Sequence, residues 1–228
     1  MISWVENLIQ IIYPNLCLVC SDPLVSGEKD VCNICQSNLP YTNYHLQSGN
    51  LMEQRFWGKV EIERATALFF YQKETSTQKL LELLKYKGEQ GVGELLGRLL
   101  GVSLLQSTDF KDIDMLVPVP LHPNKLKKRG YNQSEVICRG IGFILQKPLN
   151  TSCLYRAIEN PTQTKKGVYE RWENAAGIFA VKDEACFAEK HILLVDDVLT
   201  TGSTVEACVQ AVKQACDTRV SIATLAIA

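Results

Sequence analysis

The chain lacks several features that would assign it to large classes of protein. No apolar run is long enough to cross a membrane, and the amino terminus has neither the basic start nor the cleavage site of a signal peptide. No G-x-x-x-x-G-K-[ST] motif occurs, which excludes a P-loop nucleotide site, and the glycine-rich residues 91–97 have the wrong spacing for a dinucleotide fingerprint. We therefore expect a cytoplasmic protein with no membrane insertion.

An excess of charge of one sign is also missing, since 24 basic and 25 acidic residues give a formal net charge of -1. With 46% hydrophobic residues among 228, the chain is long enough for one main domain and a small module. We place the module, with a short amphipathic helix at its start, in residues 1–55 and the main domain in residues 56–228.

Strand-like and helix-like segments alternate through the main domain. We expect strands at 63–71, 115–119, 152–156, 178–181, 192–195 and 219–226, and helices at 78–85, 93–106, 131–145 and 205–215. Such alternation is typical of α/β proteins, in which helices flank a mainly parallel sheet.

The cysteines divide into two groups. Two C-x-x-C pairs close to the amino terminus predict a tetrahedral Cys₄ site for a structural Zn²⁺, formed by Cys17, Cys20, Cys32 and Cys35. Reduced cysteines or redox pairs are the alternatives. Because a chain without a secretion signal usually keeps its thiols reduced, we expect no disulfides and small core residues at Cys138, Cys153, Cys186, Cys208 and Cys216.

Residues 191–204 join a short apolar run to two adjacent acids and a hydroxyl-rich loop. The run suits a strand buried on both faces of a parallel sheet, and such sheets bind ligands at the carboxyl ends of their strands. A loop that opens a helix favours a phosphate, and its residues here are Thr200, Thr201, Gly202, Ser203 and Thr204. Beside a phosphate, Asp196 and Asp197 would be repulsive unless they bind hydroxyl donors, a metal ion or both. A ribose phosphate with Mg²⁺ meets these conditions; a buried strand that ends in a solvated turn is the alternative.

Residues 117–134 hold three prolines and a cluster of positive charge. No acid occurs between Asp114 and Glu135, which indicates a local anion site in a neutral chain. The prolines predict a stiff loop at the carboxyl edge of the sheet. A pyrophosphate and a nucleic-acid backbone would both suit this loop, and a solvated basic surface is the third possibility. The candidate pyrophosphate contacts are Leu121, His122, Lys127 and Arg129.

Residues 156–179 form a long polar stretch that is poor in apolar side chains. This composition is typical of an active-site lid, and a surface excursion is the alternative. A lid could bring cations toward a pyrophosphate, and the candidates are Lys165, Lys166 and Arg171.

The motifs occur in an order that resembles a known family. They are the two cysteine pairs, Pro-Val-Pro at 118–120 with Arg-Gly-Tyr-Asn-Gln at 129–133, the pattern Gln163, Arg171, Asn174 and Phe179, and Asp-Asp followed by Thr-Thr-Gly-Ser-Thr at 196–204. Over nearly the whole chain this set resembles the ComF family of competence-related proteins. The last motif closely resembles the phosphoribosyl pyrophosphate (PRPP) signature of type I phosphoribosyltransferases.

The resemblance implies a zinc finger fused to a type I phosphoribosyltransferase domain and a role in DNA uptake during natural transformation. It also implies that Asp196 and Asp197 hold the ribose hydroxyls and that residues 200–204 hold the 5′-phosphate. The expected activity is phosphoribosyl transfer from PRPP with Mg²⁺ and release of pyrophosphate, with the acceptor left open. The alternative is a non-catalytic protein that binds single-stranded DNA or other competence proteins.

Overall fold

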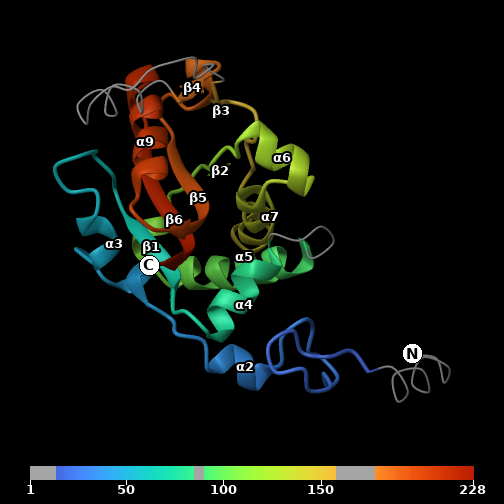
Figure 1. Cartoon of the computed structure of the whole chain (residues 1–228). Coiled ribbons are helices and arrows are strands. Elements are labelled where there is room, and N and C mark those ends of the chain that lie inside the picture. Colours follow the sequence, from blue (N-terminus) through green and yellow to red (C-terminus); the bar gives the residue numbers. More distant parts are fainter. Residues whose placement is uncertain (1–13, 85–89, 158–177) are drawn as a thin grey trace.

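A computed structural model describes residues 14–84, 90–157 and 178–228. The predicted amino-terminal helix and the candidate cations Lys165, Lys166 and Arg171 lie outside the described residues. Four parallel strands form the main sheet in the order β1-β6-β5-β2 (Figure 1). Their bounds are β1 (Ala65–Phe70), β2 (Met115–Pro118), β5 (His191–Leu199) and β6 (Arg219–Ile227). This parallel sheet confirms the predicted α/β class.

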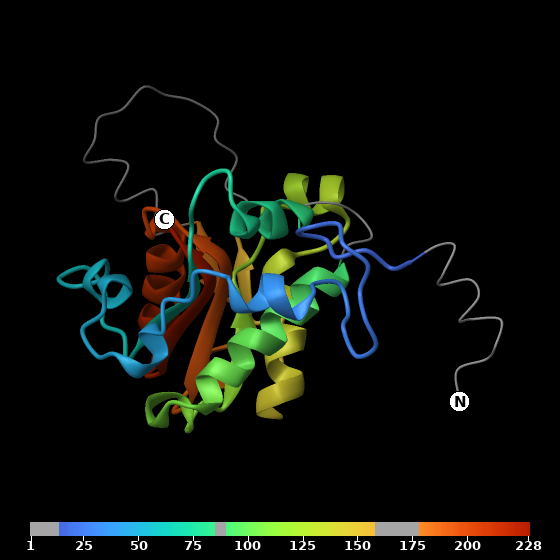
Figure 2. The ribbon, with the colours of Figure 1, turned by 90° about the horizontal axis from the view of Figure 1, so that it is seen from below.

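Helices cover both faces of the sheet. Figure 2 shows α9 (Ser203–Ala215, red) on one side, and α5 (Gln90–Leu105, green) and α7 (Gln133–Leu145, yellow) on the other. The short helix α3 (Leu51–Gln54) joins the core under α9, and α4 (Ser76–Leu83) joins the core under α5 and α7. Alternate residues of β5 belong to the two cores, which explains why its apolar run is continuous.

Helices α5 and α7 approach closely because glycines lie at their contact. A Cβ atom on Gly97 would lie 2.2 Å from the carbonyl oxygen of Ile137, and one on Gly140 would lie 2.2 Å from that of Glu94. Side chains larger than hydrogen would therefore push the helices apart. The contact fixes α7, whose amino-terminal end reaches the carboxyl edge of the sheet.

The strand β5 is longer than the prediction, which ended it at Val195. It continues through both acids because β6 pairs with it as far as Leu199, opposite Ile227. The other neighbour, β2, ends earlier, with Pro118 opposite Val195. Asp196 and Asp197 therefore lie in the strand itself, beyond the last residue of β2.

The expectation of a stiff loop after β2 is wrong, because a helix, α6 (Pro123–Arg129), forms there. Proline has no N–H group and is favoured in the first turn of a helix, where that group would have no partner. The ring of His122 caps the helix, since Nδ1 accepts a hydrogen bond from the N–H group of Asn124 at 3.1 Å. Gly130, with a φ of 83°, ends it in the left-handed conformation.

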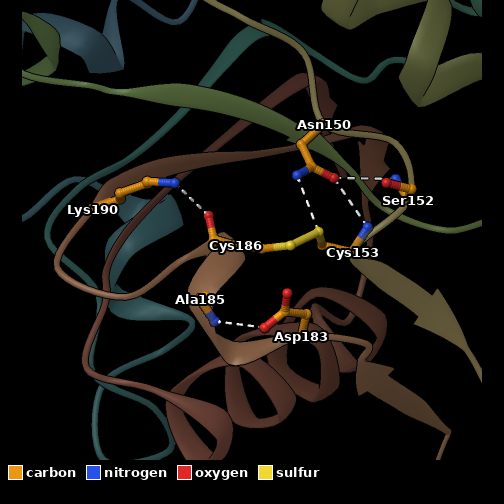
Figure 3. Close-up of a disulfide and its surroundings, with 7 residues drawn as sticks. All are labelled: Asn150, Ser152, Cys153, Asp183, Ala185, Cys186 and Lys190. Carbon is orange, nitrogen blue, oxygen red and sulfur yellow. Dashed lines mark hydrogen bonds between the residues drawn. A yellow bond between two sulfur atoms is a disulfide. The ribbon is translucent and has the colours of Figure 1, made fainter.

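Cys153 and Cys186 form a disulfide, so the expectation that both are free thiols is wrong. Two short antiparallel strands, β3 (Leu154–Arg156) and β4 (Phe179–Val181), bring them together, with Cys186 in the 3₁₀ turn η3 (Glu184–Cys186). Figure 3 shows the side-chain amide of Asn150 donating to the sulfur of Cys153 at 3.2 Å, and the ammonium of Lys190 donating to the carbonyl of Cys186 at 2.8 Å. Spacing along the chain did not reveal this pairing, because 33 residues separate the cysteines.

Residues 17–37, which hold the four cysteines of the predicted metal site, pack beside the core that α4 and α5 share. Cys17, Val31 and Cys32 belong to that core, and Lys79 of α4 donates a hydrogen bond to the carbonyl of Val19 at 2.8 Å. This segment holds α2 (Asn33–Ser37), and two further 3₁₀ turns follow later in the chain, η1 (Tyr44–Leu46) and η2 (Thr108–Phe110). The boundary between residues 55 and 56 stays a prediction.

Every helix in the described part of the chain falls short of the length and apolarity needed to cross a bilayer.

Candidate functional site

The two acids lie at the carboxyl end of β5, where both side chains are half-buried. Oδ1 of Asp196 accepts two hydrogen bonds, from the hydroxyl of Ser134 at 3.0 Å and from the N–H group of Asp197 at 2.9 Å. Burial and the charge of Asp197 raise the pKa of Asp196 to about 7, although these hydrogen bonds and the charge of Lys125 act in the opposite direction. The pair can therefore accept hydrogen bonds from ligand hydroxyls, and Asp196 can exchange a proton near neutral pH.

The predicted phosphate loop connects β5 to the first turn of α9. Gly202 is the N-cap of α9 and has a φ of 83°, a left-handed conformation that glycine adopts without strain. The hydroxyls of Thr201 and Ser203 lie 3.1 Å apart, and Thr200, Thr201, Ser203 and Thr204 are all exposed. The loop thus presents hydroxyls and a helix amino terminus to solvent, an arrangement that suits an anion.

Arg55 holds this loop from a distant part of the sequence. Its guanidinium donates hydrogen bonds to the carbonyl of Thr200 and to that of Ala228, each at 2.9 Å. The neighbouring Phe56 lies below the loop, since a Cβ atom on Gly202 would be 3.6 Å from its ring. The sequence offered no signal for either residue, because 145 residues separate Arg55 from Thr200.

The positive charges of residues 117–134 lie on α6, which follows β2. Lys125 is exposed on α6, and its charge acts to lower the pKa of Asp196. Lys125 is not among the pyrophosphate contacts that the sequence predicted. Leu121, His122 and Arg129 are half-buried, and Lys127 is exposed in the last turn of α6. Among the described residues, Lys127 and Arg129 form no ion pair.

The four cysteines of the predicted metal site come together. The sulfur atoms of Cys17, Cys20, Cys32 and Cys35 all lie within 4.8 Å of one another, and those of Cys20 and Cys32 are 3.8 Å apart. Zn–S bonds of about 2.3 Å in a tetrahedron require sulfurs about 3.8 Å apart, so the cluster fits such an ion. Although burial alone would raise it, backbone N–H donors lower the pKa of Cys17 to about 6, whereas burial and the neighbouring thiol of Cys32 raise the pKa of Cys35.

Comparison with solved structures gave matches of low overall similarity. A glutamine phosphoribosylpyrophosphate (PRPP) amidotransferase from B. subtilis, complexed with ADP and GMP, is 16% identical with a TM-score of 0.44, over 60% of this chain and 26% of that chain. A structure described as the allosteric regulatory enzyme of purine biosynthesis is 15% identical with a TM-score of 0.47, over 72% and 31%. This chain therefore spans less than a third of either.

Comparison with curated sequences gave relatives along most of the chain, although no family model matches. DNA utilization protein YhgH of Escherichia coli K12 is 28% identical over 212 residues, which cover 86% of this chain and 90% of the relative. Competence protein F of Haemophilus influenzae is 26% identical over 206 residues, which cover 82% and 86%. These relatives confirm that the chain resembles the ComF family of competence-related proteins, as its motifs predicted.

Proposed function

We propose that the protein binds PRPP or a related 5′-phosphoribosyl compound with Mg²⁺ and transfers the phosphoribosyl group to an acceptor with release of pyrophosphate. In this proposal the protein is cytoplasmic and acts in DNA uptake. The names of the relatives, which refer to competence and DNA utilization, support the link to DNA.

One observation carries the proposed ligand. Two half-buried acids at the carboxyl end of β5 lead directly into an exposed hydroxyl loop that opens α9 through a left-handed glycine. A sugar phosphate has both groups that this pair of features requires, because its hydroxyls can donate to carboxylates and its phosphate can accept from the loop. A free phosphate would leave the acids without donors.

The chain's own residues would bind and orient the reacting group. Asp196 and Asp197 would hold the ribose hydroxyls, and residues 200–204 would hold the 5′-phosphate. Lys127 and Arg129, with Leu121 and His122 at the start of α6, would face the pyrophosphate and offset the negative charge that develops as it leaves. When bound, Mg²⁺ supplies further positive charge to the pyrophosphate. Such a site acts by holding the donor and acceptor in line.

Calorimetry tests the binding step, with ribose 5-phosphate and PRPP titrated into the full chain with and without Mg²⁺. We expect both to bind and PRPP to bind more tightly with Mg²⁺. Release of pyrophosphate from PRPP with pooled bases and amines then tests catalysis. Failure of both ligands to bind would contradict the proposal.

We further propose that the four-cysteine cluster holds one structural Zn²⁺. Four thiolates fill a tetrahedral shell, so no position stays open for catalysis. Freshly purified, reduced protein should contain about one Zn²⁺ per chain by elemental analysis, as expected for a single Cys₄ site. Cys17→Ser should lose the ion and loosen residues 14–39, because metal binding and folding are coupled in a small module. Cys216→Ser, outside the cluster, is the matched control, and protein without metal would contradict the site.

A second candidate function, binding of single-stranded DNA, is favoured by the cations of α6, of which Lys127 is exposed and Arg129 half-buried. Lys127→Ala with Arg129→Ala separates the two ligands. If these cations face pyrophosphate, the double variant should lose affinity for PRPP but keep ribose 5-phosphate. If they face DNA, it should keep both small ligands and bind a labelled single strand with a shallower salt dependence. Wild-type binding of all three would show that the two cations are solvated surface charges.

A further inference from the structure

The end of α7 nearest the acids is held by a set of side-chain hydrogen bonds. Asn132 caps the helix, because its Oδ1 accepts from the N–H group of Ser134 at 3.1 Å. The amide of the same side chain donates to the carbonyl of Val119, just beyond β2, at 3.0 Å. Tyr131 is buried, and its hydroxyl donates to the carbonyl of Leu84 at 2.6 Å. The start of α7 is thus fixed to the end of β2 and to α4.

Ser134 projects from this fixed turn to the acid pair. Its side chain is 3% exposed, and its hydroxyl donates to Oδ1 of Asp196 at 3.0 Å. With the N–H group of Asp197, this gives Oδ1 two donors, and the hydrogen bonds recorded for the carboxylate among the described residues all end on that oxygen. The carboxylate is held in one orientation, with Oδ2 available to a ligand.

We propose that Ser134 is a positioning residue that orients Asp196 toward the 2-hydroxyl of a ribose and so makes the site prefer ribose over 2-deoxyribose phosphates. The inference rests on the proposed function, since it assigns a sugar hydroxyl to Asp196. A hydrogen bond to a hydroxyl needs a well-aligned acceptor. Without Ser134, Oδ1 keeps only the N–H donor of Asp197, and the carboxylate can rotate more freely about the bond from Cβ to Cγ. Ser134 itself does not touch the ligand.

The experiment compares three ligands by calorimetry, namely ribose 5-phosphate, 2-deoxyribose 5-phosphate and inorganic phosphate. We expect wild-type protein to prefer ribose 5-phosphate over its deoxy form. Ser134→Ala should weaken ribose 5-phosphate about tenfold, or about 1.4 kcal/mol, and bring the ratio of the two affinities close to one. Inorganic phosphate should bind the variant and wild type equally, because residues 200–204 are unchanged.

Three variants separate positioning from a general loss of structure. Ser134→Thr keeps the hydroxyl and should restore the preference for ribose. Ser134→Cys keeps the volume with a weaker donor and should give an intermediate ratio, so it decides the question if the alanine variant unfolds. Ser103→Ala is the matched control, because the hydroxyl of Ser103 bonds within α5, to Leu99.

The outcomes distinguish this inference from the function beneath it. If wild-type protein binds no ribose 5-phosphate, the proposed function fails and takes the inference with it. If wild type prefers ribose and Ser134→Ala and Ser134→Cys keep the same ratio, the role of Ser134 is overturned while the proposed function stands. Equal loss of all three ligands in a folded variant would also overturn it.

Discussion

The two ends of β5 carry polar side chains under very different conditions. At the amino end, the ring of the buried His191 lies 3.0 Å from a carboxylate oxygen of Asp112 and 2.8 Å from the hydroxyl of Ser221. At the carboxyl end, half-buried acids lead to exposed hydroxyls. Each ring nitrogen at the first end has a protein partner, whereas groups at the second end are open to a ligand.

The comparison shows why an arrangement of residue types does not by itself make a site. Ser221, His191 and Asp112 stand in the order of a serine hydrolase triad. Ser221 is 0% exposed, however, so its hydroxyl cannot reach an ester or amide carbon. The network therefore ties the amino ends of β5 and β6 together, and it gives no reason to expect hydrolysis. The two ends of β5 therefore differ in solvent exposure, and this exposure, not the order of the hydrogen-bonded residues, decides which end can bind a ligand.

The largest effect should come from Gly202→Val, which changes only the hydroxyl loop at the carboxyl end of β5. A valine at a φ of 83° is strained by about 1–2 kcal/mol, so the loop should leave its conformation. We expect affinity for ribose 5-phosphate and PRPP to fall by up to about thirtyfold, about 2 kcal/mol, by calorimetry. Gly202→Asn is the control, because asparagine tolerates the left-handed region and ordinary contacts surround the position. Equal loss in both variants would show that φ is not the cause.

A smaller effect is expected when the charges of both acids are removed. Asp196→Asn with Asp197→Asn should reduce Mg²⁺-dependent PRPP affinity at least tenfold, about 1.4 kcal/mol. The same change should raise the melting temperature at pH 7. Burial raises the pKa of Asp196 to about 7, so its ionised form costs folding free energy above the unfolded pKa. Unchanged PRPP affinity would contradict the assignment of the acids, and a lower melting temperature would contradict the cost of the buried charge.

The contiguous parts of both the fold and the site were predictable from the sequence. The apolar run, the acids and the hydroxyl loop are neighbours in the chain, and the paired cysteines carry their own spacing. Contacts made across the fold were not predictable. Ser134 lies 62 residues from Asp196, and Arg55 reaches the loop from 145 residues away.

Two local errors have physical causes. We treated the prolines after β2 as breakers, but Pro123 stands in the first turn of α6, where its missing N–H group costs nothing. Cys153 and Cys186 were expected to be core thiols because the chain shows no secretion signal. That rule says nothing about which cysteines the fold brings together, and here the fold places these two in bonding distance. Both errors arose where a composition rule stood in for geometry.

The smallest effect is expected at the amino end of β5, where Asp112→Asn should lower the stability of the protein and leave ligand binding unchanged. Burial acts to raise the pKa of Asp112, but hydrogen bonds from Arg219 and His191 lower it overall. A lowered folded pKa stabilises the protein above the unfolded value of about 3.9, and this contribution is lost as pH falls through the folded pKa.

The side chain of Asp112 is 54% exposed, so we expect a loss below about 1 kcal/mol at pH 7. Melting curves should therefore separate wild type from variant at pH 7 and bring them together only at a pH below the folded pKa of Asp112, which lies below the unfolded value of about 3.9. Asp217→Asn, an exposed acid close to β6, is the control for net charge. A gap that persists below the folded pKa of Asp112 would show that the carboxylate charge is not the cause, and a loss of PRPP affinity would show that the two ends of β5 are coupled.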